Sequence, residues 1–272
     1  MNRTYLAELI FNKISNEKER ISKQYFASKD KIGYFYIDGL LPEEIAQQID
    51  SYFPEKTEMT RKNNLRENKY VGAQMNKYHS FLEELIYAFQ DNKVVGIIKD
   101  ICSIKSLYPD ENLYAGGISS MSKDQFLNPH LDNSHDKDRD KWRVLNLLYY
   151  VTPNWEKKYG GHLELWPDGT SQSQITIHSL FNRLVVMCTH QSSWHSVSPV
   201  QVDRSRNCVS NYYFSDFPLL ENDSFHVTSF KGRPGQYIAN QILQLDSFIR
   251  MTIRKVFKKG IRENPHVYKK ED

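Results

Sequence analysis

Residues 144–151 read Val-Leu-Asn-Leu-Leu-Tyr-Tyr-Val, a mostly apolar run that stops shortly before Pro153. A continuous apolar run of this length is typical of a buried β-strand. The nearby proline also argues against a helix, because the residue preceding a proline avoids the helical region. Alternate side chains of a strand point to the same side. We therefore expect Asn146, Leu148 and Tyr150 to share one face of a central strand.

Shorter runs with strand character surround this stretch and are separated by turn residues such as Gly160 and Gly161. Several short strands at this spacing indicate a sandwich or barrel such as a jelly roll. The 17 tyrosines and 14 phenylalanines also favour a β-rich core. Further strand-like runs lie at residues 114–118, 162–166, 175–177, 184–188 and 208–214.

Helical spacing of apolar residues flanks this region on both sides. Residues 32–37 resemble a strand, and the polar segment 56–70 is expected to be a loop. The basic tail, residues 254–270, is expected to be a solvated helix end and a frayed terminus, with contact to an anionic substrate or partner as the alternative. The predicted helices occupy residues 1–30, 81–104, a segment beginning near 41 and another beginning near 236.

We expect a β-rich α+β fold in one domain spanning residues 1–272, because the chain has no internal repeat, low-complexity tract or persuasive linker. In this interpretation residues 1–108 give helical support and residues 109–217 form the jelly-roll core. Residues 218–272 form a C-terminal helical segment.

The composition excludes several classes of protein. A net charge of +3 over 272 residues implies no strong field for nucleic acid or a membrane surface. Cys102, Cys188 and Cys208 are too few and too scattered for a disulfide framework or a zinc motif, which favours a reducing, cytoplasmic setting. No stretch has the apolar length that spans a bilayer. The oligomeric state is left open.

The segment 128–132, Asn-Pro-His-Leu-Asp, contains a histidine and a carboxylate separated by one residue. On a strand, His130 and Asp132 would point to the same side. They could supply two of the three ligands of a 2-His-1-carboxylate triad, which leaves open positions on a non-haem Fe(II). The alternative is a surface turn, because the polar residues 133–136 follow at once.

A third ligand and an anion anchor occur further along the chain. His195 stands directly before a strand-like segment, and Arg206 begins the run 206–214. A buried arginine beside such a metal could bind the distal carboxylate of a dicarboxylic cosubstrate bidentately. Arg204 lies near the same position, but the alternation from Arg206 to Tyr212 keeps the better register.

These residues, in this order and spacing, resemble the Fe(II)- and 2-oxoglutarate-dependent dioxygenases, specifically the prolyl-4-hydroxylase-like branch. The likeness covers roughly residues 114–215, and it implies a double-stranded β-helix (jelly roll) with helices packed around it. The motifs that carry it lie at residues 130–132, 143–151, 155, 160–166, 182–186, 195–200 and 206–214.

The resemblance implies a role for each matching position. His130, Asp132 and His195 would be the iron ligands. Arg206 would pair with the C5 carboxylate of 2-oxoglutarate, with the hydroxyl of Tyr150 as a second donor.

The same comparison extends the cosubstrate pocket. Asn146 and Leu148 share the face of Tyr150 and should line it. Leu163 and Val197 occupy positions that pack against the cosubstrate in the family. One departure is Ser120, because some relatives have a tyrosine ten residues before the first histidine.

The implied activity is hydroxylation of an unactivated C–H bond, with O₂ consumed and with succinate and CO₂ released. Ascorbate is a candidate stimulant. Asp132 argues against the related halogenases, which lack this carboxylate. A small molecule, amino acid or sugar is the expected substrate. The alternatives are a peptidyl-prolyl substrate, desaturation or cyclisation at the same site, and a non-enzymatic metal-binding jelly roll.

Other polar residues are assigned more loosely. The segments 56–70 and 133–142 are the expected substrate lids. Arg143 could approach the substrate or form a salt bridge to the acidic segment 136–140. Tyr149 should lie in the core, and His162 should be structural. The histidines expected at the surface are His135, His178, His190 and His226.

Overall fold

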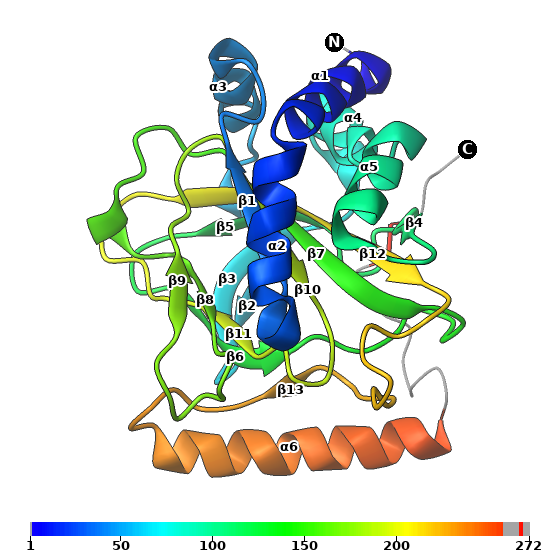
Figure 1. Cartoon of the computed structure of the whole chain (residues 1–272). Coiled ribbons are helices and arrows are strands. Elements are labelled where there is room, and N and C mark those ends of the chain that lie inside the picture. The colour runs from blue at the N-terminus through cyan, green and yellow to red at the C-terminus, as the bar shows by residue number, and fades with distance from the viewer. Residues whose placement is uncertain (1, 258–266, 269–272) are drawn as a thin grey trace.

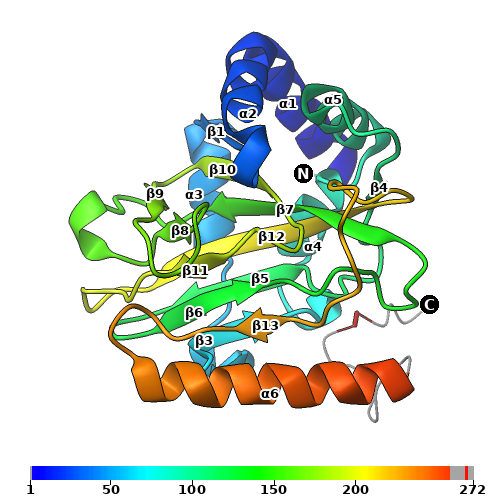
Figure 2. The same ribbon diagram turned by 60° about the horizontal axis from the view of Figure 1, so that its bottom comes forward.

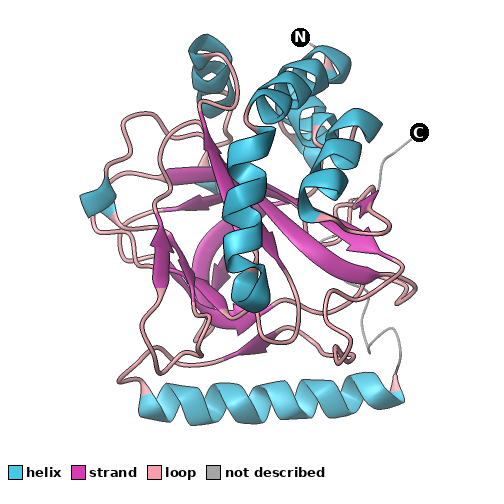
Figure 3. Cartoon of the chain, in the orientation of Figure 1, coloured by secondary structure: helices cyan, strands magenta, loops and turns pink. Residues whose placement is uncertain are grey.

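A computed structural model describes residues 2–257 and 267–268 of the chain. Most of the predicted C-terminal tail lies outside these residues. The helices, coloured cyan in Figure 3, are α1 (Arg3–Asn16), α2 (Lys18–Ile32), α3 (Glu43–Ser51), α4 (Ser80–Ala88), α5 (Asn92–Cys102) and α6 (Tyr237–Val256). Short 3₁₀ turns occur at η1 (Lys56–Glu58), η2 (Met75–Lys77) and η3 (Lys157–Tyr159).

Two of the predicted helices are each divided in two. The helix expected over residues 1–30 breaks at Glu17, which ends α1 and begins α2. The helix expected over 81–104 breaks before α5, where the Asp91 side chain accepts a hydrogen bond from the backbone N–H of Lys93. An aspartate at an N-cap starts a new helix, so the uninterrupted apolar spacing concealed a boundary.

The strands curl into an antiparallel half-barrel, as predicted for a jelly roll (Figure 2). The sheet order is β1-β10-β7-β12-β5-β3-β6-β11-β8-β9, with β2 on β3, β4 on β12 and β13 on β6. The strand bounds are β1 (Tyr34–Asp38), β2 (Thr60–Asn63), β3 (Glu67–Gly72), β4 (Tyr108–Pro109), β5 (Gly117–Met121), β6 (Phe126–Leu131), β7 (Trp142–Tyr150), β8 (Leu163–Leu165), β9 (Ile175–Ile177), β10 (Arg183–Cys188), β11 (His195–Val197), β12 (Arg206–Ser215) and β13 (Ser229–Phe230).

The prediction of a loop over residues 56–70 is wrong. This segment forms the β2–β3 hairpin, and β3 pairs with both β5 and β6. The hairpin therefore joins the two halves of the sheet. Its polar side chains gave no apolar alternation, because most of them are exposed or half-buried.

The main core lies between the N-terminal helices and the outer face of the strands β10, β7 and β12 (Figure 1). Tyr149 lies in it with 1% of its surface exposed, as expected from the alternation of β7. The opposite face of β7, which carries Asn146, Leu148 and Tyr150, is left to line the inside of the half-barrel.

Helix α6 lies on the far side of the molecule from the N-terminal helices, next to β13 (Figure 1). The predicted helix is confirmed, but among its described residues only the side chain of Leu243 is buried. The apolar residues that suggested the helix are 48–77% exposed: Ile238, Ile242, Leu245, Phe248 and Ile249. Among the helices that the structure describes, none is long and apolar enough to cross a membrane.

The join between β3 and β5 depends on a glycine, which gives a first prediction. Gly117 has a φ of +130°, and a Cβ there would lie 2.3 Å from the carbonyl oxygen of Gly72. We expect Gly117→Ala to lower the free energy of unfolding by about 2 kcal/mol or more, measured by urea denaturation.

The matched control is Gly96→Ala in the middle of α5, where a Cβ would meet no atom within 4 Å. This change should stabilise the protein by about 0.5–1 kcal/mol, because alanine favours the helix. Equal effects of the two changes would contradict the assigned role of Gly117.

Candidate metal centre and cosubstrate pocket

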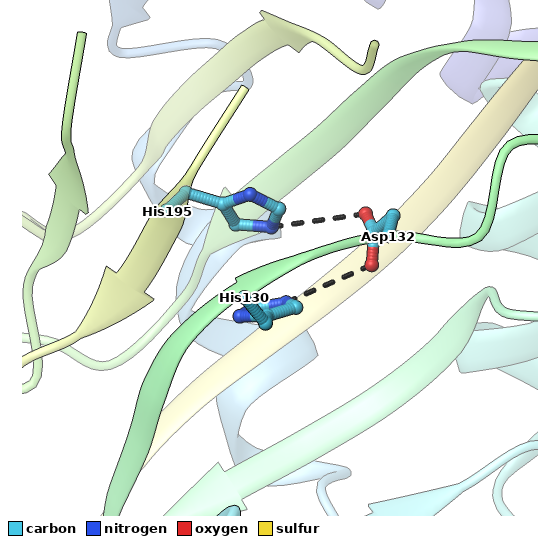
Figure 4. A group of neighbouring side chains, drawn as sticks. All are labelled: His130, Asp132 and His195. Carbon is cyan, nitrogen blue, oxygen red and sulfur yellow. Dashed lines mark ion pairs between the residues drawn. The ribbon is translucent and has the colours of Figure 1, made fainter. Parts of the chain in front are cut away.

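The antiparallel pairing of β6 with β11 places His195 directly opposite His130. Asp132 follows two residues after His130 and points to the same side, as expected for an extended segment (Figure 4). Nε2 of His130 lies 3.6 Å from Oδ1 of Asp132, and Nε2 of His195 lies 3.7 Å from Oδ2. Each of the three residues is less than 9% exposed. Three potential ligand atoms therefore converge within 4.8 Å of one another.

Backbone carbonyls select the tautomer of both histidines. Nδ1 of His130 lies 3.1 Å from the carbonyl oxygen of Asn128, and Nδ1 of His195 lies 2.9 Å from that of Ser193. A carbonyl oxygen can only accept, so each Nδ1 carries the proton. The lone pair of each Nε2 then faces Asp132, the arrangement that metal-binding histidines adopt.

The charges at the centre also suit a cation. Burial and the neighbouring His195 lower the pKa of His130 to about 3, so its ring is neutral at neutral pH. Burial raises the pKa of Asp132, but His195, Arg143 and His130 together hold it below its usual value. Its Oδ2 is buried and accepts no hydrogen bond. The neutral imidazole of His130, the neighbouring imidazole of His195 and an ionised carboxylate with an unsatisfied oxygen fit Fe(II).

The three residues open into a cavity of about 590 Å³ inside the half-barrel. Its walls carry inward-facing side chains of β7 and β12, including Ser210 and Tyr212, as the strand alternation requires. All the positions predicted to contact the cosubstrate line this same cavity: Arg206, Tyr150, Asn146, Leu148, Leu163 and Val197.

Arg206 is buried at the start of β12, with its guanidinium carbon 5.2 Å from the centre of the Tyr150 ring. Nη2 contacts the sulfur of Met121 at 2.9 Å, and the buried Nε has no hydrogen-bond partner. Burial raises the pKa of Tyr150, so its hydroxyl stays protonated. A buried cation with an unused donor beside a phenol hydroxyl is suited to bind a carboxylate.

Two residues near this end of the chain motif, Arg204 and Ser120, do not line the cavity. Arg204 is exposed and donates to the carbonyl oxygens of Pro153 and Asn154, so it is Arg206 that faces inward. On β5, Ser119 and Met121 line the cavity, whereas Ser120 between them does not. The position compared with the tyrosine of some relatives is therefore one residue away from the inward-facing side chain.

A β-bulge turns Arg143 into the cavity. Tyr213 pairs with Leu145 but Phe214 pairs with Arg143, which leaves Val144 as the extra residue of β7. Simple alternation would place Arg143 on the outer face, and a bulge re-aims such a side chain. Its Nη1 lies 3.8 Å from Oδ1 of Asp132. The expected alternative, a salt bridge to the acidic segment 136–140, does not form among the described residues.

His162 and His190 are buried, whereas the other three histidines expected at the surface, His135, His178 and His226, are half-buried. His162 is structural, as expected: Nε2 donates to the carbonyl oxygen of Lys157, and Nδ1 accepts from the backbone N–H of Ser179. The prediction of a surface position is wrong for His190, which is 6% exposed. His190 is enclosed because its turn is closed by hydrogen bonds with Ser193.

An ion pair that the sequence did not indicate supports the strand of His195. Arg233, in the segment before α6, donates to Glu164 of β8 at 2.7 Å and to the carbonyl oxygen of Val197 at 2.7 Å. Glu164 also accepts from the Ser196 hydroxyl of β11 at 2.6 Å. These contacts tie β8, β11 and the C-terminal segment together directly behind the metal centre.

The domain that contains these features matches a known family. Residues 116–214 match the family described as the 2OG-Fe(II) oxygenase superfamily. The chain therefore contains a 2OG-Fe(II) oxygenase domain over these residues. This enzyme accordingly uses Fe(II), 2-oxoglutarate and O₂ as a 2-oxoglutarate-dependent dioxygenase, as predicted.

Solved structures with a similar fold include several prolyl hydroxylases. A Pseudomonas putida prolyl-4-hydroxylase is 14% identical with a TM-score of 0.54, and the alignment covers 71% of this oxygenase and 98% of that chain. A Trichoplax adhaerens prolyl hydroxylase bound to a hypoxia-inducible-factor peptide is 17% identical with a TM-score of 0.51, covering 73% and 91%. A prolyl 4-hydroxylase from Phytophthora capsici is 18% identical with a TM-score of 0.53, covering 93% and 80%. These similarities concern the jelly-roll fold.

The ion pair behind β11 gives a second prediction. Arg233→Met should lower the free energy of unfolding by about 3–5 kcal/mol, because it leaves the buried carboxylate of Glu164 without its cation. Chemical denaturation measures this loss.

The double variant Arg233→Met/Glu164→Gln removes the charge as well as its partner. It should therefore recover part of the lost stability. A double variant less stable than Arg233→Met would contradict the interpretation.

Proposed function

We propose that His130, Asp132 and His195 bind Fe(II), and that Arg206 and Tyr150 bind the C5 carboxylate of 2-oxoglutarate. The observation that carries this proposal is the buried Arg206, whose Nε lacks a partner and which lines the same cavity as the three ligands. A jelly roll that kept a metal only for stability would not need a buried, unsatisfied cation beside it.

The chain's own groups would position the reactants. Arg206 offers a planar pair of donors to a carboxylate, and the Tyr150 hydroxyl adds a third. Leu148, Leu163 and Val197 would pack against the carbon chain of the cosubstrate and exclude water from it. When bound, Fe(II) supplies the O₂ activation that couples conversion of 2-oxoglutarate to succinate and CO₂ with hydroxylation of a C–H bond.

We infer that the substrate is a small molecule. The cavity of about 590 Å³ lies in the range typical of small-molecule sites. Arg66 of the hairpin turn and Arg139 of the 133–142 loop both line it, in keeping with the expected lid segments, and Arg250 of α6 also lines it. A cavity lined by residues of these three separate segments favours a compact substrate over an extended peptide, which is the alternative.

The cosubstrate assignment gives a third prediction. Arg206→Gln should weaken 2-oxoglutarate binding by about 30-fold or more, because it removes the charge-assisted partner of a buried carboxylate. The measurement is anaerobic titration of the Fe(II)-loaded protein, following the visible charge-transfer absorption of the 2-oxoglutarate complex.

Arg204→Gln is the matched control, since Arg204 lies two residues away but is exposed, donates to backbone carbonyl oxygens and does not line the cavity. It should bind 2-oxoglutarate like the wild type. An equal effect of the two variants would refute the choice of Arg206.

The metal assignment gives a fourth prediction. Asp132→Ala should lower Fe(II) affinity by more than about 100-fold and abolish coupled hydroxylation. Substituting a residue that only hydrogen-bonds to a metal ligand typically costs about 10- to 100-fold, and removing a ligand should cost more. Metal binding is measured by equilibrium dialysis. Asp140→Ala, at an exposed position of the following loop, is the control and should bind Fe(II) normally.

The reaction itself is tested by mass spectrometry. Wild-type protein with Fe(II), 2-oxoglutarate and ascorbate is incubated with a metabolite mixture, and products heavier by one oxygen are sought. Full hydroxylation by Asp132→Ala would mean that the ligand assignment is wrong. A product lacking two hydrogens would instead identify desaturation or cyclisation.

A further inference from the structure

The lining of the cavity has a strong excess of positive charge. Eight lysine and arginine side chains line it, against three carboxylates. Fe(II) and the doubly charged 2-oxoglutarate cancel each other, so the excess remains in the loaded site. The cationic residues are Lys62, Arg66, Lys69, Arg139, Arg143, Arg206, Arg250 and Arg254, and the acids are Glu67, Asp132 and Asp136.

Part of this charge is already neutralised by the chain itself. Lys69 pairs with Glu67 at 3.0 Å. Arg66 and Arg250 both pair with Asp246, which lies just outside the cavity. These cations therefore contribute little to the recognition of a further anion.

Arg139 is different. Among the described residues it has no ion pair with a carboxylate, and its buried Nε has no hydrogen-bond partner. Its guanidinium carbon lies 3.8 Å from the centre of the Phe225 ring, and its Nη2 donates to the backbone carbonyl oxygen of Arg254 at 2.7 Å. Burial and the neighbouring Arg254 side chain lower the pKa of Arg139. The side chains of Arg139 and Arg254 both line the cavity.

The backbone at Arg139 is also constrained. Its φ is +63°, in the left-handed region that residues other than glycine seldom adopt. Strain of this kind persists where the surroundings hold a residue in place and is frequent at ligand-binding sites. The loop therefore holds a strained residue whose cation lines the cavity.

This pair lies at the end of the cavity opposite the cosubstrate anchor. Arg206 is next to Tyr150, the last residue of β7. Arg143 precedes Tyr150 by seven residues on the same strand, and its guanidinium carbon lies 4.4 Å from the centre of the Tyr212 ring. Seven strand residues span roughly 23 Å. The ring of Tyr114 links the two basic groups, because it lies 5.7 Å from the Arg143 guanidinium and also acts on the pKa of Arg139.

We propose that the substrate carries a carboxylate or phosphate group, which Arg139 and Arg254 bind at this end of the cavity. The proposal rests on the proposed function, because it treats the space beyond the metal centre as the substrate site. An anion would satisfy the unused Nε of Arg139 through a charge-assisted hydrogen bond. The group to be oxidised would then lie between the anion site and the metal centre.

Direct binding of simple anions is the first test. Labelled inorganic phosphate and acetate are dialysed to equilibrium against the full-length protein, with and without saturating 2-oxoglutarate to block Arg206. We expect saturable binding of at least one anion in the presence of 2-oxoglutarate, weakened about tenfold or more by Arg139→Gln. Binding unchanged by this substitution, or no saturable binding, would overturn the proposal.

The matched control is Lys137→Gln. Lys137 lies in the same loop, pairs with Asp138, and does not line the cavity. It should bind the anions like the wild type. If Lys137→Gln weakened binding as much as Arg139→Gln, the effect would be one of overall loop charge and the assigned site would be wrong.

The failure of this inference can be told apart from that of the proposed function. Arg206→Gln should lose 2-oxoglutarate but keep the anion, and Arg139→Gln should do the reverse. If 2-oxoglutarate binds normally and the anions do not, the anion site alone is refuted. Arg139-dependent anion binding without 2-oxoglutarate binding would leave the anion site standing and refute the cosubstrate assignment.

Measurements of turnover show whether the anionic group of the substrate is a carboxylate or a phosphate. Carboxylic acids are compared with their amides, and phosphate monoesters with the parent alcohols, for stimulation of succinate formation. Only the charged member of a pair should stimulate, and Arg139→Gln should raise its KM more than it lowers kcat. Stimulation by a carboxylate or by a phosphate ester distinguishes the two sources. Equal stimulation by the neutral partners would overturn the proposal.

Discussion

The hydrogen-bonded register between β6 and β11 is the constraint on which the site depends. It sets His195 opposite His130, and a shift of one residue would turn one imidazole to the other face of the sheet. Carbonyl oxygens then orient both rings toward Asp132. The ion pair between Arg233 and Glu164 supports this register from behind, although it lies far from the motif in the sequence.

The cavity is organised by charge along its length. Arg206 provides a buried cation at one end, and the triad supplies one ionised carboxylate near the other. Beyond the triad, Arg143 is enclosed by aromatic rings and Arg139 stacks on Phe225. In this arrangement each reactant would be held at its own end, with the reacting atoms between them, which is how an enclosed site turns binding into orientation.

Elements outside the jelly roll complete the site. The β2–β3 hairpin bridges two halves of the sheet, and α6 brings Arg250 and Arg254 to the cavity. The hairpin sequence is polar, so its local pattern indicated a loop. The apolar residues of α6 indicated a buried helix face, but most of them are exposed. The hairpin is positioned by the pairing of β3 with β5 and β6, and α6 is positioned by docking beside β13. Both are long-range contacts.

The sequence by itself determined the β-rich core, the flanking helices and the alternation that faces Asn146, Leu148 and Tyr150 inward, because these follow from local periodicity. It also predicted the convergence of His130, Asp132 and His195, through motif order and spacing. Only the tertiary structure decided the hairpin at residues 60–72, the inward turn of Arg143 and the approach of α6 to the cavity. A bulge, a strand partner and a docked helix depend on contacts between distant segments, and such contacts leave no periodic signal in the chain.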